Sequence, residues 1–460
     1  MSAEPGRRAG GGNGKPFDVV GRTHERREAR GHVTGSTVYI DDVSYPRMCH
    51  MKAVRSPVPH ARVNGIDFSE AEKVPGYVTR LTADDVPKNV YTILCLIGVE
   101  PDEENVLAEE RVRYVGEPIA VVVCETEEAA FEAAAKVKLD LEELPAVFDV
   151  EEALESDAPI VTHWGTNYFV YEGHHCRRVR YGDAPAAREQ ADRVISGRYQ
   201  LSPIEHAPVE PTGCIAKPEA DGRVTVHTNT QAIFFSLDNT AIILQCPPHK
   251  LRFVGGTVGG GFGGKVDVIV EPLATLAAMK TGRPIKYVYT REEEMQVSST
   301  RSASRLYVTD GVNDDGTIVS REVTTYHDAG AYSRHSPYGC TKHAANAAGP
   351  YTIPNVSVDV HCVYTNRTPS SAMRGFGVTE ASFALEMQMD RVARELGVDP
   401  WELRLRHAYR NGDDRPYRKT TEDATLVETI QAAAELAGVE LSAELRAMSS
   451  DDRAGKGVAG

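Results

Sequence analysis

The sequence has no long hydrophobic run, no cysteine pair of the CxxC type and no block rich in lysine and arginine. No stretch approaches the ~18 apolar residues that a membrane-spanning helix needs. Its 8 cysteines are scattered, which argues against an iron–sulfur or zinc site in this chain. With 51 basic and 66 acidic residues the net charge is −15, so nucleic acids and anionic membranes are repelled on average. We therefore expect no membrane span and no nucleic-acid partner.

The first residues also lack an export signal, because Arg7 and Arg8 are followed by glycines and not by an apolar segment. We expect a disordered tail over residues 1–16 and a cytoplasmic protein with reduced cysteines. The composition, 41% hydrophobic and 25% charged, is that of a globular protein. A chain of 460 residues can bury several cores without disulfides.

The N-terminal third alternates short strands and helices. Ile119–Cys124 is an apolar run, and Thr126 can cap a helix over residues 127–136. Residues 137–141 then alternate between apolar and charged side chains, as in a half-buried strand. We predict one α/β domain over residues 17–150.

Residues 190–375 consist mostly of strand-like segments, interrupted by a helix over residues 271–280 that Gly282 should end. Further on, Thr379 can cap a helix that reaches Glu395. Asp399-Pro400 can open the next helix, and from about Ser442 the helical pattern fades. We predict a second domain over residues 165–445 and a C-terminal tail over residues 446–460.

Residues 255–265 contain 7 glycines in 11 positions. Such a segment is expected where the backbone takes positive φ values or lies against a ligand. As a phosphate-binding loop it lacks the Ser or Thr that should follow Lys265, because Val266 stands there. As a dinucleotide-binding loop it lacks an acidic residue near position 284, and its surroundings are rich in strands. A glycine-rich bend without a ligand is a third alternative.

Four motifs, in this order and spacing, resemble the molybdenum-cofactor subunit of the xanthine dehydrogenase and aldehyde oxidase family. They are HAPVEP at 206–211, the strand ending at Thr230-Gln231, VGGGFGGK at 258–265 and SAMRGFG at 371–377. The sequence is most similar to the large molybdopterin subunit of split enzymes such as nicotinate dehydrogenase. The resemblance implies an α+β fold, with an N-terminal α/β hammerhead domain followed by the first half of a molybdopterin-binding domain.

The resemblance also assigns cofactor contacts. The residues that would lie against the molybdopterin are Gly260, Gly261, Phe262 and Gly263. The resemblance allows both plain molybdopterin and its cytosine dinucleotide form. Gln231 would donate a hydrogen bond near the oxo ligand of the molybdenum. Gln231 and Phe262 would thus surround the metal together with Arg374, without ligating it. A strand amide that bonds only to backbone is the alternative for Gln231.

Three residues are assigned to substrate or catalysis by the same resemblance. Arg374 would steady anionic charge during the reaction, with a surface salt bridge as its alternative. Phe376 would stack on a planar substrate, or simply belong to the core. Lys342 would anchor an anionic substrate, or lie on an exposed loop.

The reaction implied is hydroxylation of an electron-poor carbon, with water as the oxygen source and electrons leaving through iron–sulfur and FAD centres. The family's general-base glutamate lies in a C-terminal half that this chain does not contain. We therefore expect a second molybdopterin subunit that carries this half, a [2Fe–2S] subunit and an FAD subunit. The chain alone should be inactive.

The substrate prediction depends on departures from the family pattern. Purine-oxidising members carry a glutamate where this chain has Val266, and the carbon monoxide branch has a cysteine that SAMRGFG lacks. Lys342 together with Arg374 would suit an anionic N-heteroaromatic acid such as nicotinate. A purine or aldehyde substrate, an NAD-dependent dehydrogenase and a non-catalytic assembly subunit remain as alternatives.

Overall fold

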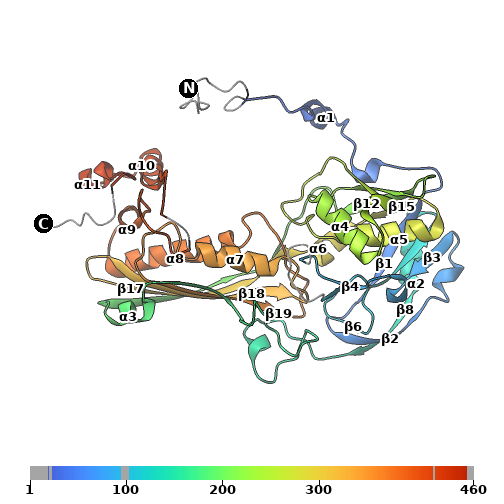
Figure 1. The fold of residues 1–460 in the computed structure, drawn as a ribbon, viewed down its shortest axis with the longest axis horizontal. Helices are drawn as coiled ribbons and strands as arrows, with labels where there is room; N and C mark the ends of the chain where they lie inside the picture. Colours follow the sequence, from blue (N-terminus) through green and yellow to red (C-terminus); the bar gives the residue numbers. More distant parts are fainter. Residues whose placement is uncertain (1–18, 20–22, 95–102, 418–419, 453–460) are drawn as a thin grey trace.

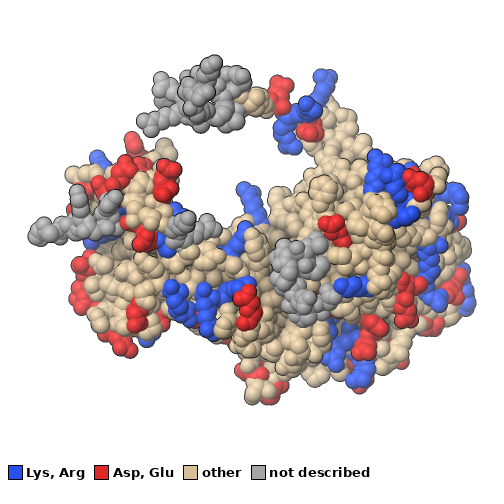
Figure 2. All heavy atoms as spheres, in the orientation of Figure 1, with Lys and Arg blue, Asp and Glu red and all other residues tan. Residues whose placement is uncertain are grey.

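A computed structural model describes residues 19, 23–94, 103–417 and 420–452. The tail predicted for residues 1–16 lies outside these ranges. The molecule is elongated, with a seven-stranded sheet at one end and a five-stranded sheet at the other (Figure 1). On the face drawn in Figure 2, basic and acidic side chains are interspersed. Within the described ranges, no helix is long and apolar enough to cross a membrane.

The seven-stranded sheet has the order β14-β13-β12-β15-β1-β7-β3. Its strands are β1 (Cys49–Arg55), β3 (Tyr77–Leu81), β7 (Pro118–Cys124), β12 (Gly213–Pro218), β13 (Val224–Thr228), β14 (Leu251–Gly255) and β15 (Ile285–Val288). Strand β1 pairs with β15 in parallel, Cys49 opposite Ile285. The domain boundary predicted near residue 150 therefore does not separate two sheets.

Helices cover both faces of this sheet. Helix α2 (Glu127–Lys136) packs on one face, and α4 (Ile233–Ile243) and α5 (Glu271–Thr281) pack on the other. Ala120 and Val122 of β7 face α2, whereas Val121 and Val123 belong to the other core. Burial on both sides explains why this strand is a continuous apolar run.

The predicted helix boundaries in this region are confirmed. The Thr126 hydroxyl accepts a hydrogen bond from the Ala129 amide at the start of α2. Gly282 ends α5 in a left-handed conformation, with φ of 65°. The strand after α2 is found as well, but it belongs to a separate sheet of order β6-β2-β8. That sheet consists of β2 (Ala61–Asp67), β6 (Arg111–Val112) and β8 (Lys138–Glu143).

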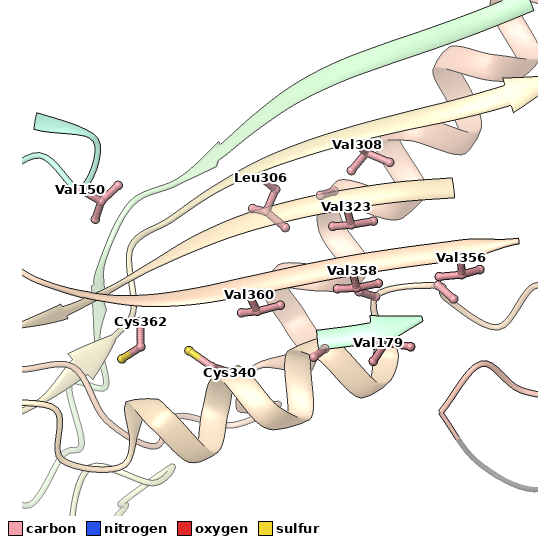
Figure 3. Packing of buried hydrophobic residues seen from close by; sticks show 14 of the residues in the cluster. Val150, Val179, Leu306, Val308, Val323, Cys340, Val356, Val358, Val360 and Cys362 are labelled. Atoms are coloured by element: carbon pink, nitrogen blue, oxygen red, sulfur yellow. The ribbon is translucent and has the colours of Figure 1, made fainter. Parts of the chain in front are cut away.

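The five-stranded sheet has the order β10-β17-β18-β19-β9. Its strands are β9 (Arg177–Tyr181), β10 (Arg193–Leu201), β17 (Ser304–Val312), β18 (Ile318–Gly330) and β19 (Val356–Tyr364). Helices α7 (Ser336–Asn346) and α8 (Val378–Leu396) lie along one side, and α3 (Ala184–Glu189) lies along the other (Figure 1). In Figure 3, Cys340 of α7 points toward Val360 and Cys362 of β19.

The other described strands and α-helices are two separate strand pairs and five helices. They are the strand pairs β4 (Val90–Tyr91) with β5 (Glu104–Asn105) and β11 (Ile204–Glu205) with β16 (Thr300–Arg301), and the helices α1 (Ala29–Thr34), α6 (Arg291–Val297), α9 (Pro400–His407), α10 (Leu426–Leu436) and α11 (Ala443–Ala447). Short 3₁₀ helices occupy Ile40–Asp42, Ala71–Lys73, Ala83–Asp85, Glu152–Leu154 and Pro248–Lys250.

Two predictions near the C-terminus need correction. Asp399 caps α9 as predicted, but Thr379 does not cap α8. The N-cap of α8 is Gly377, whose positive φ of 73° suits glycine, and the Thr379 hydroxyl donates instead to the Gly375 carbonyl at 3.0 Å. Helix α11 follows Ser442, where the helical pattern fades, because a five-residue helix is too short to show periodicity.

Candidate cofactor-binding site

The motifs at 206–211, 258–265 and 371–377 meet in space through direct hydrogen bonds. The Arg374 amide donates to the Phe262 carbonyl at 2.8 Å. The His206 Nε2 atom lies 2.8 Å from the Ala372 carbonyl oxygen. Residues 255–265, called the glycine loop below, thus lie between two segments that are distant in sequence.

Gln231 joins the same assembly just after strand β13. Its side-chain Oε1 accepts hydrogen bonds from the amides of Gly263, at 2.9 Å, and Lys265, at 3.3 Å. Two N–H donors require an acceptor, so the oxygen must face the loop and Nε2 must face away from it. The side chain is exposed, and among the described residues no partner of Nε2 is found. Half of this amide is bonded to backbone, and the other half is available as a donor.

The glycine loop presents a row of backbone donors. Within the described residues, the amides of Gly260, Gly261 and Phe262 have no hydrogen-bond acceptor. Gly260 and Phe262 have positive φ values of 107° and 52°. Successive free N–H groups in such a conformation form a concave site for anionic oxygen. The amide of Gly263, by contrast, is bonded to Gln231.

The glycines are also needed for packing within the protein. A Cβ atom at Gly261 would lie 2.5 Å from the Gln231 side chain, and one at Gly263 would lie 2.4 Å from the Ala372 carbonyl oxygen. At Gly259 a Cβ atom would lie 2.5 Å from that of Glu210. The expectation that the glycines serve a positive φ or a ligand is therefore incomplete, because close approach of the other motifs requires them too.

Lys265 and Glu210 form a buried ion pair that the sequence reasoning missed. Their charged atoms are 3.1 Å apart, and Lys265 Nζ also donates to the Glu210 carbonyl at 2.7 Å. Glu210 in turn accepts from the Gly259 amide at 2.7 Å. Burial lowers the pKa of Lys265, and the Glu210 carboxylate opposes this shift. Both residues belong to the motifs given above, where Glu210 and Lys265 stand among small and apolar neighbours. Their opposite charges were the signal that could have predicted the ion pair.

Asp267, two residues after the loop, was missed as well. Its Oδ1 lies 2.9 Å from His335 Nδ1 and accepts from the Ser371 hydroxyl at 2.7 Å. Its Oδ2 accepts from the Ser299 hydroxyl at 2.5 Å and lies 3.5 Å from Arg334 Nη1. This buried carboxylate ties the end of the loop to the 371–377 motif and to the segment before α7.

Arg374 has an exposed side chain and a fixed backbone. Its carbonyl accepts from Arg301 Nη2 at 2.6 Å, and Arg301 lies 3.6 Å from the carboxylate of Glu380. In the part of the chain that the structure describes, no ion pair of the Arg374 guanidinium is found. Among the described residues, the surface salt bridge that was its alternative is not found, and its role stays a prediction.

Phe376 and Lys342 come together around Tyr338 of α7. The Phe376 and Tyr338 ring centroids are 6.3 Å apart, and Lys342 Nζ lies 5.0 Å from the Tyr338 centroid. Lys342 is exposed, as its alternative expected, but it lies on the helix α7 and not on a loop. The two residues thus share one aromatic neighbour, which the sequence reasoning did not identify.

The local topology also tests the two nucleotide-binding alternatives. In both, the glycines lead directly into a helix whose N-terminus holds phosphate. Here α5 begins at Glu271, after irregular backbone that follows Lys265. The glycine loop therefore has neither geometry.

Comparison with known proteins identifies two family domains in the chain. The model of the molybdopterin cofactor-binding domain matches residues 169–408, and that of the aldehyde oxidase and xanthine dehydrogenase a/b hammerhead domain matches residues 34–145. The chain is 34% identical to the nicotinate dehydrogenase large molybdopterin subunit of Eubacterium barkeri, over 92% of this chain and 97% of that one. It is 33% identical to the aldehyde oxidoreductase of Megalodesulfovibrio gigas, over 92% of this chain and 48% of that one.

Solved structures of similar fold include two oxidoreductases. The aldehyde oxidoreductase from Desulfovibrio gigas matches with a TM-score of 0.85 and 32% identity, over 91% of this chain and 47% of that one. Quinoline 2-oxidoreductase from Pseudomonas putida 86 matches with a TM-score of 0.82 and 28% identity, over 90% of this chain and 53% of that one. The chain thus spans about half the length of these relatives and nearly all of the Eubacterium subunit.

Fold and motifs together define a molybdopterin-binding α+β protein with an N-terminal hammerhead domain. The chain belongs to the xanthine dehydrogenase and aldehyde oxidase family, as its four motifs predict.

Proposed function

We propose that the chain is the molybdopterin subunit of a multi-subunit hydroxylase that oxidises an N-heteroaromatic acid of the nicotinate type, with water as the oxygen source. The observation that carries this proposal is the convergence of four motifs on one row of free amides. Gln231 and Arg374 both hydrogen-bond to the segment that bears this row.

The residues present fit a molybdopterin. The free amides of Gly260, Gly261 and Phe262 can bind its anionic oxygens, and Gln231 Nε2 can donate to an oxygen beside the metal. When bound, the cofactor supplies two-electron redox chemistry. Arg374 can add a positive charge next to the loop, because its backbone is held there by hydrogen bonds at both N–H and C=O.

The proposed substrate class follows from the side chains on α7 and in the 371–377 motif. Tyr338 and Phe376 offer aromatic surface to a planar ring. Lys342 and Arg374 are exposed cations that can pair with a carboxylate. Val266 is apolar, where purine-oxidising members carry a glutamate. The similarity to a nicotinate dehydrogenase subunit supports the same substrate class.

Large apolar side chains next to the site support partner subunits. Val209 is 91% exposed and lies in the first motif, Phe234 is 81% exposed and follows Gln231, and Phe262 is 49% exposed. Apolar groups gathered around a site usually mark an interface. We propose that a second molybdopterin subunit covers this surface and supplies the general-base glutamate. Electrons would pass to [2Fe–2S] and FAD subunits.

The test is to purify the chain with its native partners and measure its metal, its pterin and its reaction. We expect molybdenum and pterin in the complex, hydroxylation of nicotinate, and transfer of ¹⁸O from labelled water to the product. A complex without molybdenum would indicate an assembly subunit. A complex that hydroxylates xanthine or oxidises aldehydes but leaves nicotinate unchanged would overturn the substrate assignment.

A further inference from the structure

Each of the four consecutive residues before α7 contacts a buried carboxylate. The Tyr332 hydroxyl donates to Glu117, and both the amide and the hydroxyl of Ser333 donate to Glu103. Arg334 pairs with Glu104 at 2.7 Å, and His335 lies 2.9 Å from Asp267. We call this assembly the clasp, and it consists of Tyr332, Ser333, Arg334 and His335 with Glu103, Glu104, Glu117 and Asp267.

The clasp joins three separate parts of the chain. Its glutamates come from the N-terminal region, Asp267 comes from the end of the glycine loop, and residues 332–335 connect β18 to α7. All four carboxylates are buried, with exposures of 1–6%. Burying that many acidic groups is unfavourable unless each one is hydrogen-bonded. Apolar packing alone does not require four buried carboxylates, so their hydrogen bonds to residues 332–335 need a different explanation.

The clasp reaches the proposed substrate pocket through the first turn of α7. The carbonyl of His335 accepts from the amides of Tyr338, at 3.0 Å, and Gly339, at 3.1 Å, and the Ser333 carbonyl accepts from the Ser336 amide at 2.8 Å. Tyr338 carries the ring that has both Phe376 and Lys342 as neighbours. Residues 333–335 are therefore connected through backbone hydrogen bonds to the turn that carries this ring.

Other contacts hold α7 at a different place. His343, farther along the helix, lies 3.1 Å from the Thr325 hydroxyl and 3.0 Å from His327, which fixes the helix to the five-stranded sheet. The apolar contacts of Cys340 and Ala344 are non-directional. At the N-terminal end, the Ser336 hydroxyl donates to the Ser370 carbonyl at 2.9 Å and the Tyr171 hydroxyl donates to the Pro337 carbonyl at 3.1 Å. The clasp adds the directional contacts of the residues that lead into this turn.

We infer that the clasp is a positioning device, through which buried carboxylates of the N-terminal region and Asp267 hold Tyr338 and Lys342 in place against Phe376. This inference rests on the proposed function, because it takes these three residues as the substrate pocket. The clasp residues act through α7 and need not touch substrate.

The experiment compares Ser333→Ala with Ser450→Ala, a matched loss of a buried hydroxyl, because Ser450 also donates both its amide and its hydroxyl to one carboxylate, that of Glu428. In the full chain, hydrogen exchange of the Ser336, Tyr338 and Gly339 amides should become about tenfold faster in Ser333→Ala, since local opening becomes easier there. Exchange in α5 should not change. In the complex, KM for an anionic heteroaromatic acid should rise about fivefold while kcat stays within about twofold, as expected when only substrate binding is weakened.

Glu103→Gln, which keeps the shape but weakens the acceptor, provides the second variant and should give the same pattern. Unchanged exchange at 336–339 in both variants would overturn the inference. Exchange that rises equally in α5 would overturn it too, because it indicates a general loss of stability. Faster exchange at 336–339 with an unchanged KM would remove the link to substrate. The exchange measurement needs no cofactor, so it is independent of a failure of the proposed function, which would appear as missing molybdenum.

Discussion

The two sides of the candidate site are built in different ways. On one side, the glycine loop, Gln231 and residues 371–377 are joined mainly through backbone amides and carbonyls. On the other side, α7 brings Tyr338 and Lys342, and buried carboxylates hold its N-terminal end. The first side therefore tolerates few changes of backbone shape, whereas the second responds to single polar side chains.

The difference follows from what each side has to hold. A cofactor with many oxygen atoms is bound well by fixed N–H groups, which stay in place only if the backbone is rigid. A substrate with one charged group needs one cation at the right distance, and a side chain on a helix can supply it. Cofactor binding should thus be lost through glycine substitutions, and substrate binding through changes around α7.

The largest effect is expected from Gly263→Val. Its Cβ atom would lie 2.4 Å from the Ala372 carbonyl oxygen, and φ is 109°, a conformation that valine avoids. The loop would then separate from the 371–377 motif, and cofactor loading should be abolished. Molybdenum content of the purified complex measures this loss.

The control for backbone strain alone is Gly222→Val. Gly222 also has a positive φ of 81°, but nothing lies within 4 Å of its Cβ position. This variant should load cofactor normally although it is destabilised. Equal molybdenum contents in the two variants would contradict the placement of the loop.

Arg374→Ala removes a cation from the backbone-built side without touching its hydrogen bonds. Cofactor content should stay normal, because the amide and carbonyl of residue 374 keep their partners. Turnover should fall about 100-fold, the scale seen when one electrostatic donor is removed. Arg394→Ala, at an exposed arginine of α8, is the matched control and should keep full turnover. Unchanged turnover in Arg374→Ala would refute the assigned role.

The clasp should make stability depend on pH. Burial raises the pKa of Glu117 from 4.5 to about 7, and nearby Glu104 adds to the rise, while hydrogen bonds from Tyr332 and the Arg113 amide and the Arg113 charge oppose it. The folded state therefore binds this proton more tightly than the unfolded state does. The resulting stability is complete below about pH 4.5 and is lost as the pH rises through about 7.

Glu117→Gln tests this because the amide cannot ionise. Its single oxygen can still accept from the Tyr332 hydroxyl, whereas the bond from the Arg113 amide is lost at every pH. Between pH 5 and pH 8 the wild-type free energy of unfolding should fall by about 2 kcal/mol relative to the variant. Denaturant titrations at the two pH values measure the difference. A constant difference between the proteins would show that Glu117 does not titrate in this range.

The smallest effect is expected from Lys342→Gln. Loss of one exposed cation should raise KM for an anionic heteroaromatic acid about tenfold and leave kcat nearly unchanged, because the charge contributes to binding more than to the reaction. A neutral heteroaromatic substrate should be unaffected. Lys250→Gln, at another exposed lysine, is the control. Equal KM changes for charged and neutral substrates would contradict the assignment of Lys342.

The sequence predicts those features that local patterns encode. Thr126, Gly282 and Asp399 mark helix ends because capping involves neighbouring residues only. The family and its fold class follow from four motifs in order. The pairing of β1 with β15 could not be predicted, because nothing local in either strand specifies a partner some 230 residues away.

The site divides in the same way. Gln231, Phe262 and Arg374 were named from their motifs, and the structure brings them together, but their roles stay predictions. The clasp was missed because Glu103, Glu117 and Ser333 look like ordinary surface residues in the sequence. Only the tertiary structure buries them. No periodicity or spacing in the sequence predicts a hydrogen bond between a carboxylate and a donor more than 200 residues farther along the chain.

The parallel pairing of β1 with β15 has a consequence for biosynthesis. Until the ribosome has made residue 288, the chain contains β1 and β7 but not the strand that covers the free side of β1. An uncovered strand edge has unpaired N–H and C=O groups that can bind a strand of another chain. The nascent protein therefore passes through a long interval in which its first strands are complete but their sheet is not, and a slow translation pause before β15 should favour aggregation.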